Sequence, residues 1–184
     1  MEVSKEKNRN KSLSQFKYIL LFFFLYAFIG WLLESGYAIY NLGKFTKRGF
    51  LYGPICPIYG YGAVILILFL QKYKDNSIKL FIYSAFVFST LEYFVSFGLE
   101  ALFHEKWWDY TNEFFNLNGR ISIFYSFVWG IFAILFINNI HPFFEKHINI
   151  LLQKVSYSWQ ITTLYAIALI YLVDTIFSII KYMI

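Results

Sequence analysis

Apolar residues form five long runs along the chain, and polar residues gather in the short segments between them. A helix needs about 20 predominantly apolar residues to cross the hydrocarbon core of a bilayer. The runs meet or approach this length at Phe16–Tyr40, Pro54–Leu70, Ile78–Phe103, Ile121–Ile140 and Trp159–Ile180. The pattern therefore predicts an all-α polytopic membrane protein, a bundle of about five transmembrane helices.

The polar segments divide the chain into three predicted parts. Residues 1–15 form a polar cytoplasmic tail, residues 16–142 a membrane domain of four spans, and residues 143–184 an interfacial segment followed by the fifth span. The basic start followed by an apolar run could be mistaken for a signal peptide. The run is too long for one, however, and no cleavage site of small residues follows it. We therefore interpret it as a retained first span.

Composition agrees with a lipid environment. The chain is 59% hydrophobic with a mean hydropathy of +0.52, which leaves too little polar surface for a soluble domain of 184 residues. Its single cysteine, Cys56, excludes an internal disulfide and any multi-cysteine metal site. We expect no metal and no cofactor. We also expect no nucleic-acid partner, since no basic surface remains once the spans are placed.

Lysine and arginine positions predict the orientation in the membrane. With the N-terminus inside, ten of them fall on the cytoplasmic side and six outside. Cytoplasmic segments normally have the excess of positive charge. We therefore expect a multi-pass protein of the bacterial plasma membrane with its N-terminus inside, its C-terminus outside, and membrane lipids as partners.

The stretch RGFLYGPICPIYGYG, residues 48–62, interrupts the apolar pattern with four glycines and two of the three prolines. A Gly-x-x-x-Gly spacing favours the close approach of another helix. Proline prevents a regular helix from beginning cleanly before it. Irregular backbone at membrane depth is tolerated only where protein buries it or where it lines a cavity. The stretch predicts a broken entry to the second span, which is either a ligand site or a packing elbow built by Gly49, Gly53, Pro54, Pro57 and Gly60.

Four acidic residues lie in the predicted spans or at their ends: Glu34, Glu92, Glu100 and Asp174. Such residues are costly in lipid and usually face other helices or a wet cavity. Ser89, Glu92, Ser96 and Glu100 follow one another at steps of three and four residues, which predicts one polar stripe on a helix. The stripe could hold helices together through shared hydrogen bonds, or it could have a functional role.

Two arginines open predicted spans in a chain that has thirteen lysines and only three arginines. Arginine can form a bidentate pair with a carboxylate or a phosphate, a geometry that lysine does not match. Arg48 and Arg120 could pair with Glu34 and Glu100 respectively, or bind a ligand. The hypothesis that joins these observations is an outward-facing polar site, capped by aromatic and acidic side chains of the outer loop, whose members are Glu34, Arg48, Glu92, Glu100, Trp107, Trp108, Asp109 and Arg120.

A weak internal repeat relates the two halves of the predicted membrane domain. LLES…NLGKFTKRGFLYG and GLEA…NLNGRISIFYS each contain a span ending in glutamate, an Asn-Leu pair and an arginine before the next span. The similarity is either a parallel repeat of two helical hairpins or chance in a sequence of low diversity. A true repeat would place the two glutamate–arginine pairs around a pseudo-twofold axis.

Several of these motifs resemble a known family. FIGWLLESGY, KRGFLYGPICPIYGYGA, LEYFVSFGLEALFHEKWWDY and FNLNGRI are similar to the putative ABC-transporter type IV family, the CmpB-like bacterial membrane proteins. The similarity covers about Tyr18 to Pro142 and leaves the fifth span outside. Thr111 stands where the family usually has serine.

The resemblance implies a permease or another transport component. Five spans are few for a transport pathway, so the expected partner is a separate ATPase subunit or further copies of the chain. The sequence has no P-loop with which to hydrolyse ATP itself. Only residues 141–158 could serve as a coupling segment for an ATPase.

Two alternatives belong to other functional classes. A small membrane enzyme acting on lipid or cell-envelope precursors would use Glu92 or Glu100 as a general acid-base and the arginines to hold a phosphate. A non-catalytic accessory subunit would bind only lipid or a partner. The lack of a P-loop and of a metal motif makes an enzyme the weaker interpretation.

The predicted topology can be tested by cysteine-accessibility labelling. We expect a cysteine at Thr111 to react with an impermeant reagent from outside, and a cysteine at Asn76 to react only from inside. The reverse pattern would refute the five-span topology.

Overall fold

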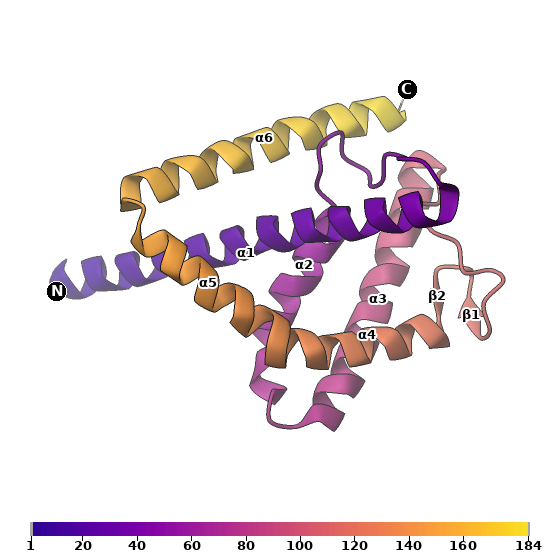
Figure 1. Ribbon diagram of the computed structural model, residues 1–184, viewed down its shortest axis with the longest axis horizontal. Helices are drawn as coiled ribbons and strands as arrows, with labels where there is room; N and C mark the ends of the chain where they lie inside the picture. The colour runs from indigo at the N-terminus through magenta and orange to yellow at the C-terminus, as the bar shows by residue number, and fades with distance from the viewer. Residues whose placement is uncertain (1, 184) are drawn as a thin grey trace. The chain divides into compact units, whose positions relative to one another are not determined.

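The computed structural model describes the backbone of residues 2–183 and the side chains of residues 15–183, and this part of the chain is mostly helical (Figure 1). Four of its helices are long and apolar enough to cross a membrane. They are Gln15–Leu42 within α1 (Glu2–Leu42), α3 (Ser77–Phe103), the continuous helix Ile123–Gln153, and α6 (Tyr157–Met183). The predicted all-α membrane fold is confirmed.

The second predicted span is a shorter and irregular run of helix. It begins as α2 (Pro57–Ile65), continues as the π-helical η1 (Leu66–Leu70) and ends as the 3-10 helix η2 (Gln71–Tyr73). Pro57 is the first helical residue, a position where the missing N–H of proline costs no helical hydrogen bond. The prolines therefore delay the helix as the sequence predicted.

The chain divides into two compact units, which we describe separately. The first unit contains the residues up to Val64 and Leu152–Ser178, and the second contains Ile65–Leu151 and the residues after Ser178. The first therefore includes α1, most of α2 and most of α6. The second includes α3 and the helix that follows it.

Small residues bring α1 and α2 together in the first unit. A Cβ on Gly60 would lie 2.7 Å from both the ring and the carbonyl oxygen of Phe23. Phe23 and Phe24 form the buried centre of this unit with Leu164 of α6. Gly49 and Gly53 lie in the non-helical segment between α1 and α2, and Gly53 lies close to Asp174 of α6.

The second unit pairs α3 with α4 (Ile123–Leu135). A Cβ on Gly130 of α4 would meet the Phe81 ring of α3 at 2.6 Å, so the helices approach closely there. Between them the chain forms a short antiparallel hairpin of β1 (Asn116–Leu117) and β2 (Ile121–Ser122). The Ser122 side chain caps α4 by accepting a hydrogen bond from the Tyr125 N–H, which explains why α4 begins two residues later than the predicted span.

The segment predicted to lie at the interface continues the preceding helix. A π-helical turn, η3 (Phe136–Ile140), joins α4 to α5 (His141–Gln153). Pro142 lacks the N–H of a regular helix, and a widened turn directly before it lets the helix continue. α5 ends at a short turn before α6 (Figure 1).

The backbone at Gly49 supports a stability prediction with a built-in control. Gly49 and Gly43 both have positive φ, +87° and +65°, but only at Gly49 would a Cβ meet another group, the Cys56 Sγ at 2.8 Å. We expect Gly43→Ala to cost about 1 kcal/mol of backbone strain and Gly49→Ala clearly more. Thermal unfolding of the two variants in detergent measures the difference, and equal melting temperatures would contradict this account.

Candidate functional site

The polar stripe of α3 faces protein in the second unit. Ser89 Oγ lies 2.6 Å from Ser126 Oγ of α4. Glu92 and Ser96 are buried, and Glu100 is half-buried at the end of the helix. The stripe therefore contacts α4 and the segment that connects α3 to α4.

Glu92 is the most deeply buried acidic side chain of the described residues, with 7% of its surface exposed. The Tyr110 hydroxyl, from the connecting segment, donates a hydrogen bond of 3.2 Å to its Oε1. Oε2 is buried and has no hydrogen-bond partner among the described residues. The Trp129 indole adjoins the carboxyl group, but its N–H forms no hydrogen bond of normal geometry within that part of the chain. Glu92 Oε2 and Trp129 Nε1 are thus a neighbouring acceptor and donor, each without a partner of normal geometry among the described residues.

Arg120 lies at the Glu100 end of the stripe. Its Nη2 contacts Glu100 Oε2 at 2.5 Å, with 14% of the arginine side chain and 33% of the glutamate side chain exposed. The guanidinium also lies over the rings of Tyr93 and Phe97, at 5.6 and 5.5 Å. Its Nε is buried and has no acceptor among the side chains and backbone that the structure describes. The arginine is therefore fixed in place with one donor available to another group.

The three predicted cap residues differ in their contacts. The Trp108 indole donates to the Arg120 carbonyl at 3.0 Å, so this residue supports the site. Trp107 packs on Phe103, with ring centroids 6.0 Å apart. Asp109 is exposed and accepts hydrogen bonds from the hydroxyl and the N–H of Thr111, which lower the pKa of its carboxyl group. These contacts belong to the local turn at Asp109 and Thr111.

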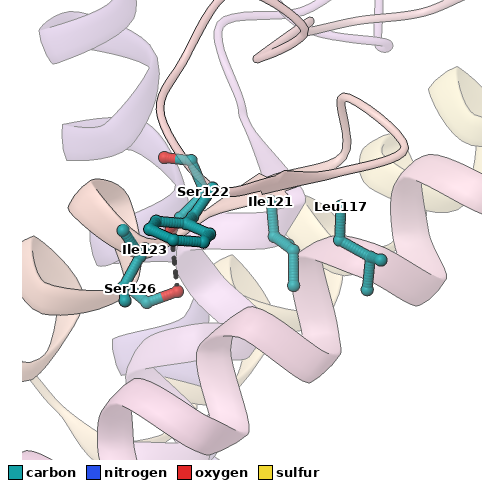
Figure 2. Close-up of a pocket in the computed structure, with 6 residues that line it drawn as sticks. Leu117, Ile121, Ser122, Ile123 and Ser126 are labelled. Atoms are coloured by element: carbon teal, nitrogen blue, oxygen red, sulfur yellow. Dashed lines mark hydrogen bonds between the residues drawn. The ribbon is translucent and has the colours of Figure 1, made fainter.

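A shallow hollow of about 310 Å³ lies beside the hairpin (Figure 2). Its lining is mainly apolar, and the Ser126 hydroxyl donates inward to the Ser122 carbonyl at 2.9 Å. The hollow is lined by Phe115, Leu117, Ile121, Ser122, Ile123 and Ser126. Neither Glu92 nor Arg120 lines the hollow.

A second glutamate–arginine pair lies in the first unit. Arg48 Nε is 3.9 Å from Glu34 Oε2, and both side chains are more than a third exposed. Glu34 Oε1 accepts a hydrogen bond of 2.6 Å from the Tyr59 hydroxyl of α2. This pair is looser than Arg120–Glu100, and the tyrosine is the nearer partner of the carboxylate.

Asp174 of α6 was not a member of the predicted polar site, yet it has well-defined partners in the structure. Its two oxygens accept hydrogen bonds of 2.8 Å from the N–H groups of Tyr52 and Gly53. The sequence marks Asp174 as one of four acidic residues in the predicted spans, but gives no signal for partners 121 and 122 residues away. Tyr59 and Tyr110 were also missed, because sixteen tyrosines in an aromatic chain give no means of selecting them.

Each predicted glutamate–arginine pair lies within its own unit. The structure therefore brings Glu34 to Arg48, and Glu100 with Glu92 to the segment containing Arg120. The convergence of all four groups in one site stays a prediction.

Double-mutant cycles test whether each pair is coupled. We expect Arg120→Gln or Glu100→Gln alone to reduce folded yield more than the double variant, because a lone half-buried charge is costly. The coupling should be weaker between Glu34 and Arg48, whose distance is longer and whose side chains are more exposed. For each pair, the folded yield from membranes is measured by size-exclusion chromatography for the wild type, both single variants and the double variant. Additive losses at Glu100 and Arg120 would contradict the coupling.

Comparison with known proteins identifies the family. No curated protein and no solved structure matches the chain. The family model described as putative ABC-transporter type IV matches residues 21–179. This match extends well beyond Pro142 and includes most of α6, so the expectation that the fifth span lies outside the family similarity is wrong. The chain belongs to the putative ABC-transporter type IV family.

Proposed function

We propose that this chain is the membrane-embedded component of a transport system in the bacterial plasma membrane, and that its ligand site lies around Glu92, Glu100 and Arg120. The family description and the four long apolar helices support a membrane transport component. The lysine and arginine distribution supports an inside N-terminus, which places the segment 104–122 and the site beneath it on the outer side.

The observation that most favours a ligand at this place is the unused hydrogen-bonding capacity. Within the described residues, Glu92 Oε2 is an unpaired acceptor and Arg120 Nε an unpaired donor, and both atoms are buried. Buried polar atoms without partners are costly, so these two atoms call for an explanation, and a ligand is one. A polar ligand with both a donor and an acceptor would satisfy them. Ionisable side chains within membrane spans commonly mark the path of a substrate or an ion.

The connecting segment gives such a site a removable cover. Tyr110 bonds to Glu92, and Trp108 bonds to the backbone of Arg120. Both side chains come from the segment between α3 and the hairpin, a stretch of turns and irregular backbone. Movement of this one segment would expose Glu92 and Arg120 together. A ligand could thereby enter from the outer side while α3 and α4 stay packed.

An ATPase partner is the second part of the proposal. The chain is short of spans for a complete pathway and contains no P-loop. α5 is the candidate contact: its polar residues Glu145, Lys146 and His147 are followed by exposed apolar residues, Ile150 and Leu151. An association of copies of the chain is the alternative way to complete a pathway.

The test begins with purification from native membranes in mild detergent. We expect an ATP-binding subunit to co-purify in a fixed ratio, and its ATP hydrolysis to rise several-fold when low-mass metabolites of the host are added. Glu92→Gln should still form the complex. Its ligand stimulation of ATP hydrolysis should fall about tenfold or more, which is the effect of losing a buried hydrogen bond to a charged group. Thr90→Ala is the matched control, because the Thr90 hydroxyl bonds to the Phe86 carbonyl within α3 and lies outside the site.

Three outcomes would contradict the proposal in different ways. Absence of any ATPase from the purified protein would contradict the proposed ATPase partner. Equal stimulation of ATP hydrolysis in the wild type and in Glu92→Gln would show that Glu92 does not take part in ligand binding. Chemical conversion of a lipid or envelope precursor without ATP, lost in Glu92→Gln, would favour the enzyme hypothesis instead.

A further inference from the structure

The segment between α1 and α2 is held by a carboxylate from the other end of the sequence. Tyr52 N–H and Gly53 N–H are successive backbone donors, and each reaches a different oxygen of Asp174 at 2.8 Å. Successive amides that point to one anion form a nest, a backbone arrangement found in many anion sites. Here the anion is supplied by α6 of the same chain.

The residue types fit this arrangement. A Cβ on Gly53 would lie only 2.9 Å from Asp174 Oδ2, so a larger residue would push the carboxylate away. Gly53 is absent from the residues with positive φ, so its backbone would accept alanine, and its lack of a side chain serves the carboxylate. Ser178, one turn further along α6, donates a hydrogen bond of 3.1 Å to Asp174 Oδ1.

The rest of the segment is anchored close to the nest. The Gly53 carbonyl accepts a hydrogen bond from Ile55 N–H at 2.9 Å, and Cys56 N–H donates to the Ala27 carbonyl of α1 at 3.0 Å. Leu51 and Cys56 are buried, with 1% and 4% of their surfaces exposed. The irregular backbone is therefore fixed between α1 and α6, and the contact to α6 includes charge-assisted hydrogen bonds.

We propose that the Tyr52–Gly53 amides form a carboxylate-binding nest whose tethered ligand is Asp174, and that α6 thereby holds the segment containing Arg48 in place. The last helix then has a defined structural role, because it supplies the anion that the irregular backbone requires. Arg48 is four residues before Tyr52, and the nest fixes the distance over which it can reach Glu34. This role is independent of whether the chain transports a ligand.

Cys56 is the natural reporter, since it is the only cysteine and is buried directly after the nest. The full-length protein in native membranes is treated with N-ethylmaleimide, and the labelling rate of Cys56 is measured by mass spectrometry. In wild type we expect slow labelling. In Asp174→Ala the rate should rise about tenfold or more, because loss of charge-assisted hydrogen bonds favours opening of the segment by at least that factor.

Chemical rescue separates an anion site from ordinary packing. Acetate should fill the vacated nest in Asp174→Ala and slow the labelling toward the wild-type rate. Acetamide at the same concentration and ionic strength has nearly the same shape but no charge, and it should have little effect. Equal rescue by acetate and acetamide would overturn the proposal, as would wild-type labelling of Asp174→Ala.

Two further variants keep the test decisive if Asp174→Ala does not fold. Gly53→Ala retains the carboxylate but forces it away from the amides, so it should speed labelling, and acetate should not reverse the effect. Thr175→Ala is the matched control, because the Thr175 hydroxyl bonds to the Tyr171 carbonyl within α6 at 2.7 Å and lies outside the nest. It should label at the wild-type rate. Slow labelling of Gly53→Ala would overturn the proposal.

Discussion

The cost of placing a carboxylate in a membrane determines how the segments between the helices fold. Glu34, Glu92, Glu100 and Asp174 lie in helices long and apolar enough to cross a bilayer, and each accepts a hydrogen bond or an ion pair from outside its own helix. An uncompensated charge in such a place costs several kcal/mol. These partners come from two stretches of the described chain, residues 48–59 and 110–120. The stretches therefore have little freedom in how they fold.

The two stretches supply different groups to the carboxylates. Residues 48–59 meet Glu34 with a tyrosine hydroxyl and a distant arginine, and meet Asp174 with backbone amides. The stretch 110–120 meets Glu92 with a tyrosine hydroxyl and Glu100 with a close arginine. A tyrosine and an arginine thus recur in both units. Only the arginine occupies matching places in the sequence repeat, because Tyr59 follows Arg48 and bonds to Glu34, whereas Tyr110 precedes Arg120 and bonds to Glu92.

The sequence predicted the parts of this structure that depend on local pattern. Apolar runs indicated the four long helices, and steps of three and four residues placed Ser89 and Glu92 on one helix face. Proline chemistry indicated the delayed start of α2 at Pro57. The Gly49-x-x-x-Gly53 motif lies outside any helix, so its spacing does not form the usual contact between two helical faces. Before Pro57 the backbone stays irregular, and Gly53 faces the carboxylate of Asp174.

Contacts between distant residues were beyond the reach of sequence reasoning. A backbone amide has no residue signature, so nothing at Tyr52 or Gly53 indicates that Asp174 is its acceptor. The charged pairs were accessible because arginine is rare in this chain and each one lies near a glutamate in sequence. Glu92 differs from the other three acids in this respect. Among the described residues its donor of normal geometry is a neutral hydroxyl, and one of its oxygens is left without a partner. A carboxyl group that was needed only to join helices would be satisfied by its neighbours, as Glu100 is by Arg120. The unpaired oxygen of Glu92 is therefore the physical reason to look for a ligand there.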